Sequence, residues 1–348
     1  MNSIRRFIPF FLDNTIWFLL VPVVIFFVSL ENNFFTVNNL ISILSYAAIM
    51  GIIAIGQSFT LITGNFDLSQ ESTVGLCGLM GVWLIGSAGD PLYGSGLMLP
   101  VWLTIPILML LGLAIGWING NLITRYKVNN FIVTLGMLIA IRGITYVISY
   151  GATVFSDNKL YNSFGGGTIW IVNYPILFML ALFVVFYVVL KYTKFGRELY
   201  AVGANRKAAL ASGVNPDVRI RQVYLISGVL AAFAGFLLSA RLTNVMPTMG
   251  KGMIFEVTAA AVIGGISLQG GRGSLIGVFG GVLLLSAINS GLNLMEVSVF
   301  WIDVIRGLVI LIAMFIDAQK SRIMLFGLTP EKQKTPGSAE GVKPFGAI

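Results

Sequence analysis

Two carboxylates, Asp67 and Glu71, lie in the stretch GNFDLSQESTVG, between two segments apolar enough to lie in a lipid bilayer. A carboxylate at such a place has two uses. It can stabilise the positive end of a helix that begins beside it, or it can contact a hydrogen-bonding solute that crosses the membrane. Because the second apolar segment begins near Glu71, the residues alone leave both interpretations open.

Charged residues inside the other apolar segments are few, and each costs about 2.5 to 3.5 kcal/mol at the centre of a bilayer. Asp303 and Arg306 stand three residues apart, so on a helix they share a face and are expected to form a structural ion pair. Arg142 has no charged residue near it in the sequence. It therefore either binds carbonyl groups at helix ends or lines a cavity. Glu256 and Asp317 lie near the ends of their segments.

The residues of several common catalytic sites are missing. Without histidine there is no Ser-His-Asp set and no usual metal ligand or proton shuttle. The single cysteine, Cys77, lies among apolar residues, as buried structural cysteines do. No P-loop motif is present to bind nucleotide phosphates. We therefore expect no catalytic residue, no metal site and no cofactor bound by this chain.

The composition indicates a membrane protein, since 57% of the residues are hydrophobic and 10% are charged, against about 25% charged in soluble domains. A helix needs about 20 apolar residues to cross a bilayer. The expected fold is an all-α, polytopic bundle of about ten transmembrane helices, at residues 15–30, 41–62, 72–88, 97–123, 131–150, 168–190, 222–241, 256–267, 274–291 and 299–317.

The expected organisation is one transmembrane domain, residues 15–318, between a short N-terminal segment, 1–14, and a tail, 319–348. The tail is rich in Lys, Pro and Gly, and we expect it to be disordered. If the N-terminus is cytoplasmic, the outer loops carry only Lys159, Arg241 and Lys251, and the remaining Lys and Arg outside the spans lie inside. This bias predicts that both termini are cytoplasmic. It also explains the net charge of +8 through contact with anionic lipid, without a nucleic-acid partner.

One loop of the expected inner side, residues 191–222, is long and charged. Residues 197–202 are expected to form a helical turn, and Asn205 is a suitable N-cap for the helix RKAALASG, which ends at Gly213. The loop is either a basic segment with incidental helicity or a docking helix whose small residues let another protein approach. Arg206 and Lys207 oppose the helix dipole, so helix stability does not explain them.

A similar pattern occurs twice: ITGNFDLSQESTVGLCGLMG at 62–81 and IGGISLQGGRGSLIGVFGG at 263–281. Each runs from an apolar helix through a glycine-containing break into a helix with spaced glycines. Matching broken helices in two halves suggest a duplicated transporter fold whose breaks lie near the pathway. Composition alone offers a second explanation.

Several of these stretches resemble the permease subunits of bacterial ribose, xylose and galactose ABC importers. They are TKFGRELYAVGANRKAALASGVN, AAAVIGGISLQGGRGSLIGVFGG, INSGLNL, GNFDLS and FIVTLGM, and the resemblance spans residues 40–318. It implies an inner-membrane permease that pairs with a second permease, docks on a cytoplasmic ABC ATPase that binds ATP and Mg, and receives a sugar from an extracytoplasmic binding protein.

The resemblance also implies roles for individual residues. The residues expected to contact the ATPase are Gly196, Arg197, Gly203, Asn205, Ala208, Ala209 and Gly213. We expect Asp67, Ser69 and Asn65 to lie near the translocation route. The rival hypotheses are a secondary, ion-coupled transporter, which the scarcity of buried carboxylates disfavours, and a membrane-embedded enzyme, for which no catalytic set is present.

The sequence departs from the family pattern in places. Asn65 and Phe66 replace Gly-Ile, Asn130 replaces a frequent proline, and Arg206 and Lys207 stand where acidic residues are common. Glutamine and glutamate at 70 and 71 replace Val-Gly, and alanine at 204 replaces a frequent glycine. The departures suggest a solute other than ribose and a dedicated ATPase with a more acidic docking groove. The sequence leaves open whether the solute is a pentose, hexose, polyol, sugar-like signal or nucleoside, and whether the second permease is identical.

Overall fold

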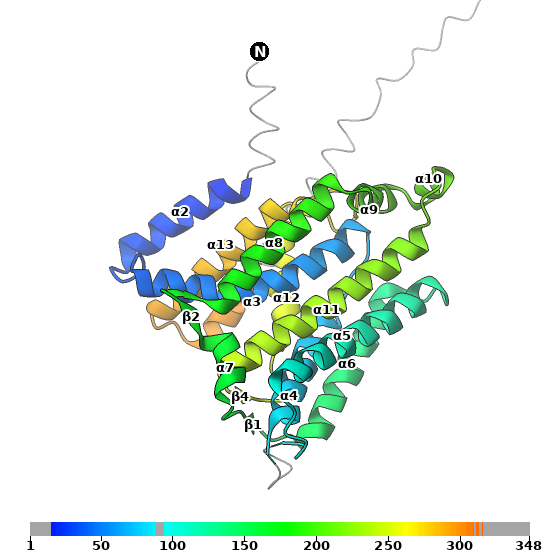
Figure 1. The fold of residues 1–348 in the computed structure, drawn as a ribbon. Coiled ribbons are helices and arrows are strands. Elements are labelled where there is room, and N and C mark those ends of the chain that lie inside the picture. The colour runs from blue at the N-terminus through cyan, green and yellow to red at the C-terminus, as the bar shows by residue number, and fades with distance from the viewer. Residues whose placement is uncertain (1–14, 88–93, 310, 313–314, 316–348) are drawn as a thin grey trace, which may run out of the picture.

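Long apolar helices make up most of the structure, a computed structural model that describes residues 15–87, 94–309, 311–312 and 315 (Figure 1). The helices are α2 Thr15–Leu30, α3 Val37–Ile62, α4 Gln70–Ile85, α5 Val101–Thr124, α6 Asn130–Ser149, α7 Lys159–Gly166, α8 Tyr174–Tyr192, α9 Lys194–Ala204, α10 Arg206–Ala211, α11 Pro216–Leu242, α12 Met253–Ile263 and α13 Leu275–Leu294. Six of them, α3, α5, α6, α8, α11 and α13, are long and apolar enough to cross a membrane. The prediction of a helical, multi-pass membrane protein is thus confirmed.

The predicted spans differ from the helices in two informative places. Residues 168–173 were expected to begin a span, but β2 (Thr168–Ile169) and β3 (Val172–Asn173) form a small hairpin there, and α8 begins only at Tyr174. The span 256–267 was placed too late, because α12 ends at Ile263. The last predicted span is helical over 299–309, and most of the rest lies outside the described residues, as do the segments 1–14 and 319–348.

Helix α11 lies in the middle of the bundle, against α3, α4 and α5. Its contact with α5 is a backbone-to-backbone approach: a Cβ atom on Gly112 would overlap the carbonyl group of Gly228, and one on Gly116 would overlap that of Tyr224. Transmembrane helices commonly use small residues in this way. Close packing therefore explains these glycines, as expected.

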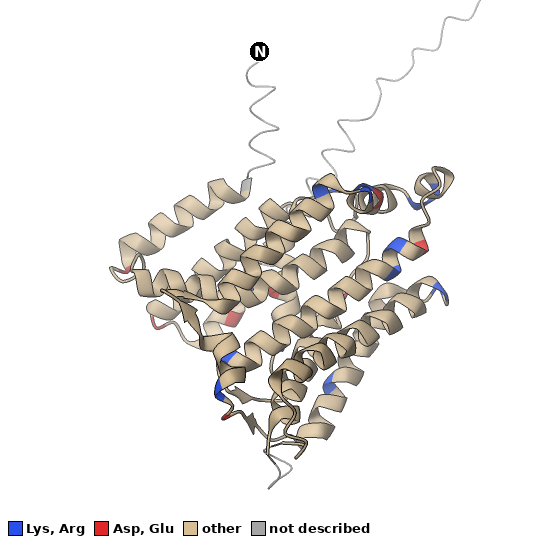
Figure 2. Cartoon of the chain, in the orientation of Figure 1, with Lys and Arg blue, Asp and Glu red and all other residues tan. Residues whose placement is uncertain are grey.

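The two ends of the bundle carry different elements. At one end, α9 and α10 lie beyond the ends of α8 and α11 (Figure 1), and Lys127 in the α5–α6 turn pairs with Asp217 of α11 at 2.6 Å. At the opposite end, β1 (Val154–Phe155) pairs antiparallel with β4 (Asn244–Val245). Figure 2 shows that Lys and Arg gather at the end that carries α9 and α10.

The segment 191–222 forms the local structure that its sequence predicts. Asn205 Oδ1 accepts hydrogen bonds from the backbone N–H groups of Lys207 and Ala208, both at 3.0 Å, so it is the N-cap of α10. Gly213 ends this turn in the left-handed region, with φ +82°. Helix α9 is longer than the predicted turn at 197–202.

Candidate functional site

The break between α3 and α4, residues 63–69, is held by a network of buried side chains around Asp67. Asp67 Oδ1 accepts from Ser69 Oγ at 2.6 Å and from Ser69 N at 3.1 Å, and Asp67 Oδ2 accepts from Ser227 Oγ at 2.6 Å. Each hydroxyl accepts in turn from an amide: Ser69 from Asn119 Nδ2 at 2.8 Å, and Ser227 from Gln70 Nε2. Because Ser227 is on α11 and Asn119 is on α5, the carboxylate fastens the break to both helices.

The interpretation of the carboxylates as caps of α4 needs correction. The N-cap of α4 is Ser69, whose side chain accepts no capping hydrogen bond, and Asp67 instead accepts from Ser69 in the loop and from Ser227 on α11. Glu71 serves another helix: its Oε2 accepts from the N–H of Gly252 at 2.9 Å. Gly252 is the N-cap of α12, so Glu71 places its negative charge at the positive end of a helix 181 residues further along the chain.

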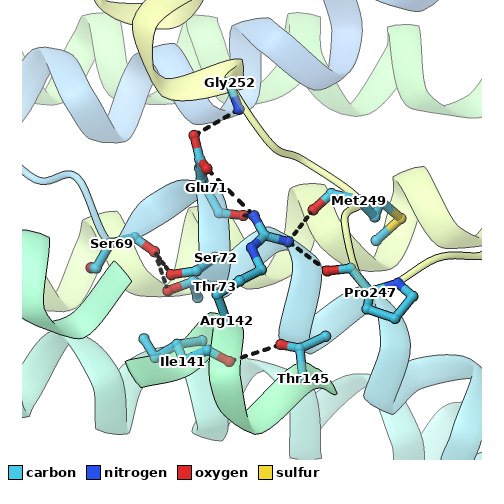
Figure 3. A network of polar contacts seen from close by, with 10 residues as sticks. All are labelled: Ser69, Glu71, Ser72, Thr73, Ile141, Arg142, Thr145, Pro247, Met249 and Gly252. Atoms are coloured by element: carbon cyan, nitrogen blue, oxygen red, sulfur yellow. Dashed lines mark hydrogen bonds and ion pairs between the residues drawn. The ribbon is translucent and has the colours of Figure 1, made fainter. Parts of the chain in front are cut away.

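Arg142 on α6 lies beside Glu71 (Figure 3). Its Nη1 donates to the carbonyl oxygens of Pro247 at 2.8 Å and Met249 at 2.7 Å, and its Nη2 is 3.5 Å from Glu71 Oε1. Of the two alternatives for Arg142, carbonyl binding is therefore correct, with an ion pair that the sequence did not indicate. The pair attaches residues 246–252 to α4 and α6.

The expected ion pair between Asp303 and Arg306 is present at 3.2 Å. Arg306 Nη1 also lies 2.9 Å from Glu256 Oε1, and Tyr46 donates to Glu256 Oε2 at 2.7 Å. The cluster thereby joins the helical residues 299–309 to α12 and α3. It borders a pocket whose other walls are mainly aliphatic.

Asn65 connects the break to two other elements. Its Oδ1 accepts from Asn130 Nδ2 at 3.2 Å and from Arg206 Nη2 at 3.1 Å. Asn130 is the first residue of α6 and Arg206 is the first residue of α10. Three positions at which the sequence departs from the pattern of the permeases that it resembles thus meet at one oxygen atom.

Helix α9 lies against both of the breaks that the repeated pattern marked. A Cβ atom on Gly203 would overlap the carbonyl oxygen of Ile62, which already accepts from Gly271 N at 2.8 Å. Tyr200 donates to the carbonyl of Gly273 at 2.8 Å, and burial raises the pKa of its phenol, which keeps this donor protonated. The breaks at 63–69 and 264–274 therefore contact each other and share α9 as a neighbour.

The residues that were predicted to contact an ATPase are divided between the surface and the interior. Ala208 and Asn205 are exposed, whereas Ala209 is 3% exposed and packs in a cluster with Val202 and Tyr224. A Cβ atom on Gly196 would overlap the backbone of Leu190 in α8. Arg197 Nη1 donates to the carbonyl of Tyr192 at 3.3 Å. Ala209 and Gly196 thus hold α9 and α10 in place.

The sequence did not identify Ser227, Asn119 or Gly252 as members of the networks around Asp67 and Glu71. Each lies far in the sequence from its bonding partner, and no local sequence pattern marks it. Among the described residues, no group of three or more His, Cys, Asp or Glu side chains is arranged to hold a metal ion.

Known proteins resemble most of the chain. Residues 39–314 match the model of a family described as the branched-chain amino acid transport system / permease component. The ribose import permease protein of Haemophilus influenzae is 35% identical, covering 86% of this chain and 91% of the relative. An L-arabinose ABC transporter permease protein of Azospirillum brasilense is 34% identical over 82% and 81% of the two chains. The galactose/methyl galactoside import permease protein of Escherichia coli is 30% identical over 91% and 97%.

No solved structure matches the chain. The family match covers both breaks, the segment that carries α9 and α10, and the Glu71–Arg142 pair. With the apolar helices and the extent of these matches, the chain is a member of this family of ABC importer permeases.

Proposed function

We propose that this chain is the permease subunit of an ATP-driven importer of a monosaccharide or a similar small hydroxylated solute. The relatives named above are permeases for ribose, L-arabinose and galactose, which share a polyhydroxylated ring but differ in size. The permease does not hydrolyse ATP: a partner ATPase binds ATP and Mg, and an extracytoplasmic binding protein delivers the solute. A second permease, a copy or a paralogue, completes the pathway.

The observation that carries this proposal is the position of α9 against both breaks. Gly203 leaves room for only backbone contact with Ile62, and Tyr200 bonds to Gly273. A protein that pushes on α9 and α10 would therefore move the ends of α3, α4, α12 and α13 together. A secondary transporter has no need of such a surface. Asn65, Asp67 and Ser69, which hold the first break, shape the translocation route in this proposal.

The proposed topology has ten spans and both termini in the cytoplasm of a bacterial cell, in the inner membrane. Support comes from the pairing of helix ends. Residues 191–222, the α5–α6 turn and both breaks share one end, whereas β1 and β4 share the other. This arrangement agrees with helices that cross in alternating directions, and the basic end then faces the cytoplasm.

Two measurements test the proposal. Tagged protein is purified from its native membranes in mild detergent, and the proteins present in stoichiometric amounts are identified by mass spectrometry; we expect an ABC ATPase. Uptake of labelled ribose, arabinose and galactose is then measured in cells treated with a protonophore while ATP is maintained. Uptake that continues supports the importer. Uptake that stops, with no ATPase recovered even after crosslinking, favours the ion-coupled transporter.

A further inference from the structure

Residues 246–252, between β4 and α12, form a non-helical segment inside the bundle. Two glycines there, Gly250 and Gly252, have φ +79° and +83°, which side-chain-bearing residues rarely adopt. The segment contains two successive turns: Met249 N donates to the carbonyl of Met246 at 2.9 Å, and Lys251 N donates to that of Thr248 at 3.0 Å. The backbone is therefore built as a defined irregular segment and not as an extension of a helix.

The contacts of this segment set its position relative to the neighbouring helices. Arg142, which binds the carbonyls of Pro247 and Met249, stands about 18 Å along α6 from Asn130 and about 10 Å before Ser149, at 1.5 Å per residue. Helix α12 has 11 residues and is thus about 16 Å long, which is about half the thickness of the hydrocarbon core. The segment accordingly meets α6 between its two ends, at the level of a helix long enough to cross a membrane, and Lys251 belongs to this segment.

The side chains of the segment face two ways. Pro247 and Met249 are buried against the protein, whereas Met246, Thr248 and Lys251 are exposed. Within the described part of the chain, the Lys251 ammonium and the Thr248 hydroxyl have no side-chain hydrogen bond. Irregular backbone at membrane depth occurs only where protein covers it or where it lines a water-filled space, and a lipid-facing ammonium would be costly.

We infer that residues 246–252 line the solute route, and that Thr248 and Lys251 hydrogen-bond to the hydroxyl groups of the passing monosaccharide. This role rests on the proposed function. The Glu71–Arg142 pair behind the segment is balanced in charge, and Glu71 already occupies the N-terminus of α12. The Thr248 hydroxyl and the Lys251 ammonium therefore remain on the exposed side of the segment. Both can donate hydrogen bonds to the oxygen atoms of a polyhydroxylated ring.

Cysteine accessibility tests this inference directly, because the only native cysteine, Cys77, is fully buried. Thr248→Cys and Lys251→Cys are expressed in intact cells with the full importer and treated with a membrane-impermeant, sulfonated methanethiosulfonate reagent. The control is Val184→Cys: Val184 lies near the middle of α8 and is 64% exposed on an apolar face. The reagent needs a hydrated thiolate, so a thiol in lipid does not react.

We expect rapid modification at 248 and 251, slowed several-fold by saturating sugar or by trapping the ATPase with vanadate, and no modification at 184. Absence of labelling at 248 and 251 in cells that still take up sugar would overturn the inference and leave the proposed function standing. A disulfide between two copies of Thr248→Cys would also overturn it, because the second permease would then cover the segment. Loss of sugar uptake by the parent chain counts against the proposed function alone.

A pair of substitutions gives an independent readout. Lys251→Met removes the donor and Lys251→Gln keeps one. We expect the methionine variant to take up neutral sugar several-fold more slowly at unchanged ATPase recruitment, with partial rescue by glutamine. Equal uptake by all three chains would show that the Lys251 side chain does not contact the solute. If only a sugar acid were affected, the segment would select anions, contrary to the inference.

Discussion

Arg206 at the start of α10 donates from Nη2 to Asn65 Oδ1 in the break between α3 and α4, at 3.1 Å. The two residues are 141 positions apart in the chain, and Asn130 donates to the same oxygen at 3.2 Å. The guanidinium therefore ties the surface helix to the break. This contact gives Arg206 an internal role, beside the earlier interpretation that it faces an acidic groove on an ATPase.

The first prediction is that Asn65→Ala lowers the amount of sugar taken up per ATP hydrolysed. The alanine removes the acceptor for both donors, so α10 can move without the break. Asn65→Asp keeps the acceptor and adds a charge opposite Arg206, and we expect its coupling to match that of the native chain. Uptake and ATP hydrolysis are measured together in proteoliposomes that contain the whole importer.

A double-mutant cycle with Arg206→Ala separates this contact from other effects of each residue. A hydrogen bond to a charged group contributes about 1.5–3 kcal/mol when it is buried, and solvent reduces this at a partly exposed site. We expect an interaction of about 1 kcal/mol in the ratio of sugar taken up to ATP hydrolysed. Additive effects of Asn65→Ala and Arg206→Ala would mean that the two side chains act separately, and would contradict the prediction.

The second prediction concerns Gly203, where α9 meets the end of α3. In Gly203→Ala the new methyl group overlaps the Ile62 carbonyl and the Gly271 N–H, so α9 must shift; overpacking of this kind costs about 1–3 kcal/mol. We expect normal insertion, lower thermal stability and a several-fold loss of uptake. Gly136→Ala on α6 is the matched control, because a Cβ there has no neighbour within 4 Å. If the two variants had equal thermal stability and equal uptake, the contact of α9 with α3 would have no part in coupling.

The third prediction concerns Glu71 and Arg142, whose side chains are 7% and 13% exposed. Glu71→Ala leaves the guanidinium without its counter-ion and the Gly252 N–H without an acceptor, and breaking a buried pair costs about 3–5 kcal/mol. Glu71→Gln keeps an acceptor for Gly252, so we expect a smaller loss. Thermal unfolding in detergent, followed by the loss of monodisperse protein, checks the order. A glutamine variant as unstable as the alanine variant would show that the charge, and not the bond to Gly252, matters most.

How much of this structure can be predicted from the sequence depends on how many positions separate two interacting residues in the chain. Asn205 and Gly213 flank α10 and bond to residues two or three positions away, and a local pattern identifies both. The backbone groups of residues 247–252 that bond to Arg142 and Glu71 lie 105 to 181 positions away, in a segment with no periodicity to mark it. A hydropathy pattern gives the length of a span, but it does not say which helix end meets which.

The same limit explains the errors at helix ends. Residues 168–173 are apolar enough to continue α8, yet Trp170 adopts φ +59° and the chain folds back as a hairpin. A hydropathy profile does not detect this reversal of the chain. Glu71, in contrast, was expected near the start of α4 and is there; only its partner differs, since the Gly252 N–H at the start of α12 donates to its carboxylate.

The fourth prediction concerns Asp67, whose two oxygens accept from Ser69 and Ser227. Asp67→Ala deprives both hydroxyls of their acceptor and frees the break from α11, so we expect unstable protein and little uptake. Ser227→Ala removes one donor to Asp67 and the acceptor of Gln70 Nε2 but keeps Ser69 in place, and should cost about 1–3 kcal/mol of stability with most uptake retained. Both are measured as thermal stability and as initial uptake rate at matched expression. Unchanged uptake by Asp67→Ala would show that the break functions without its anchor, and would exclude Asp67 from the translocation route as well.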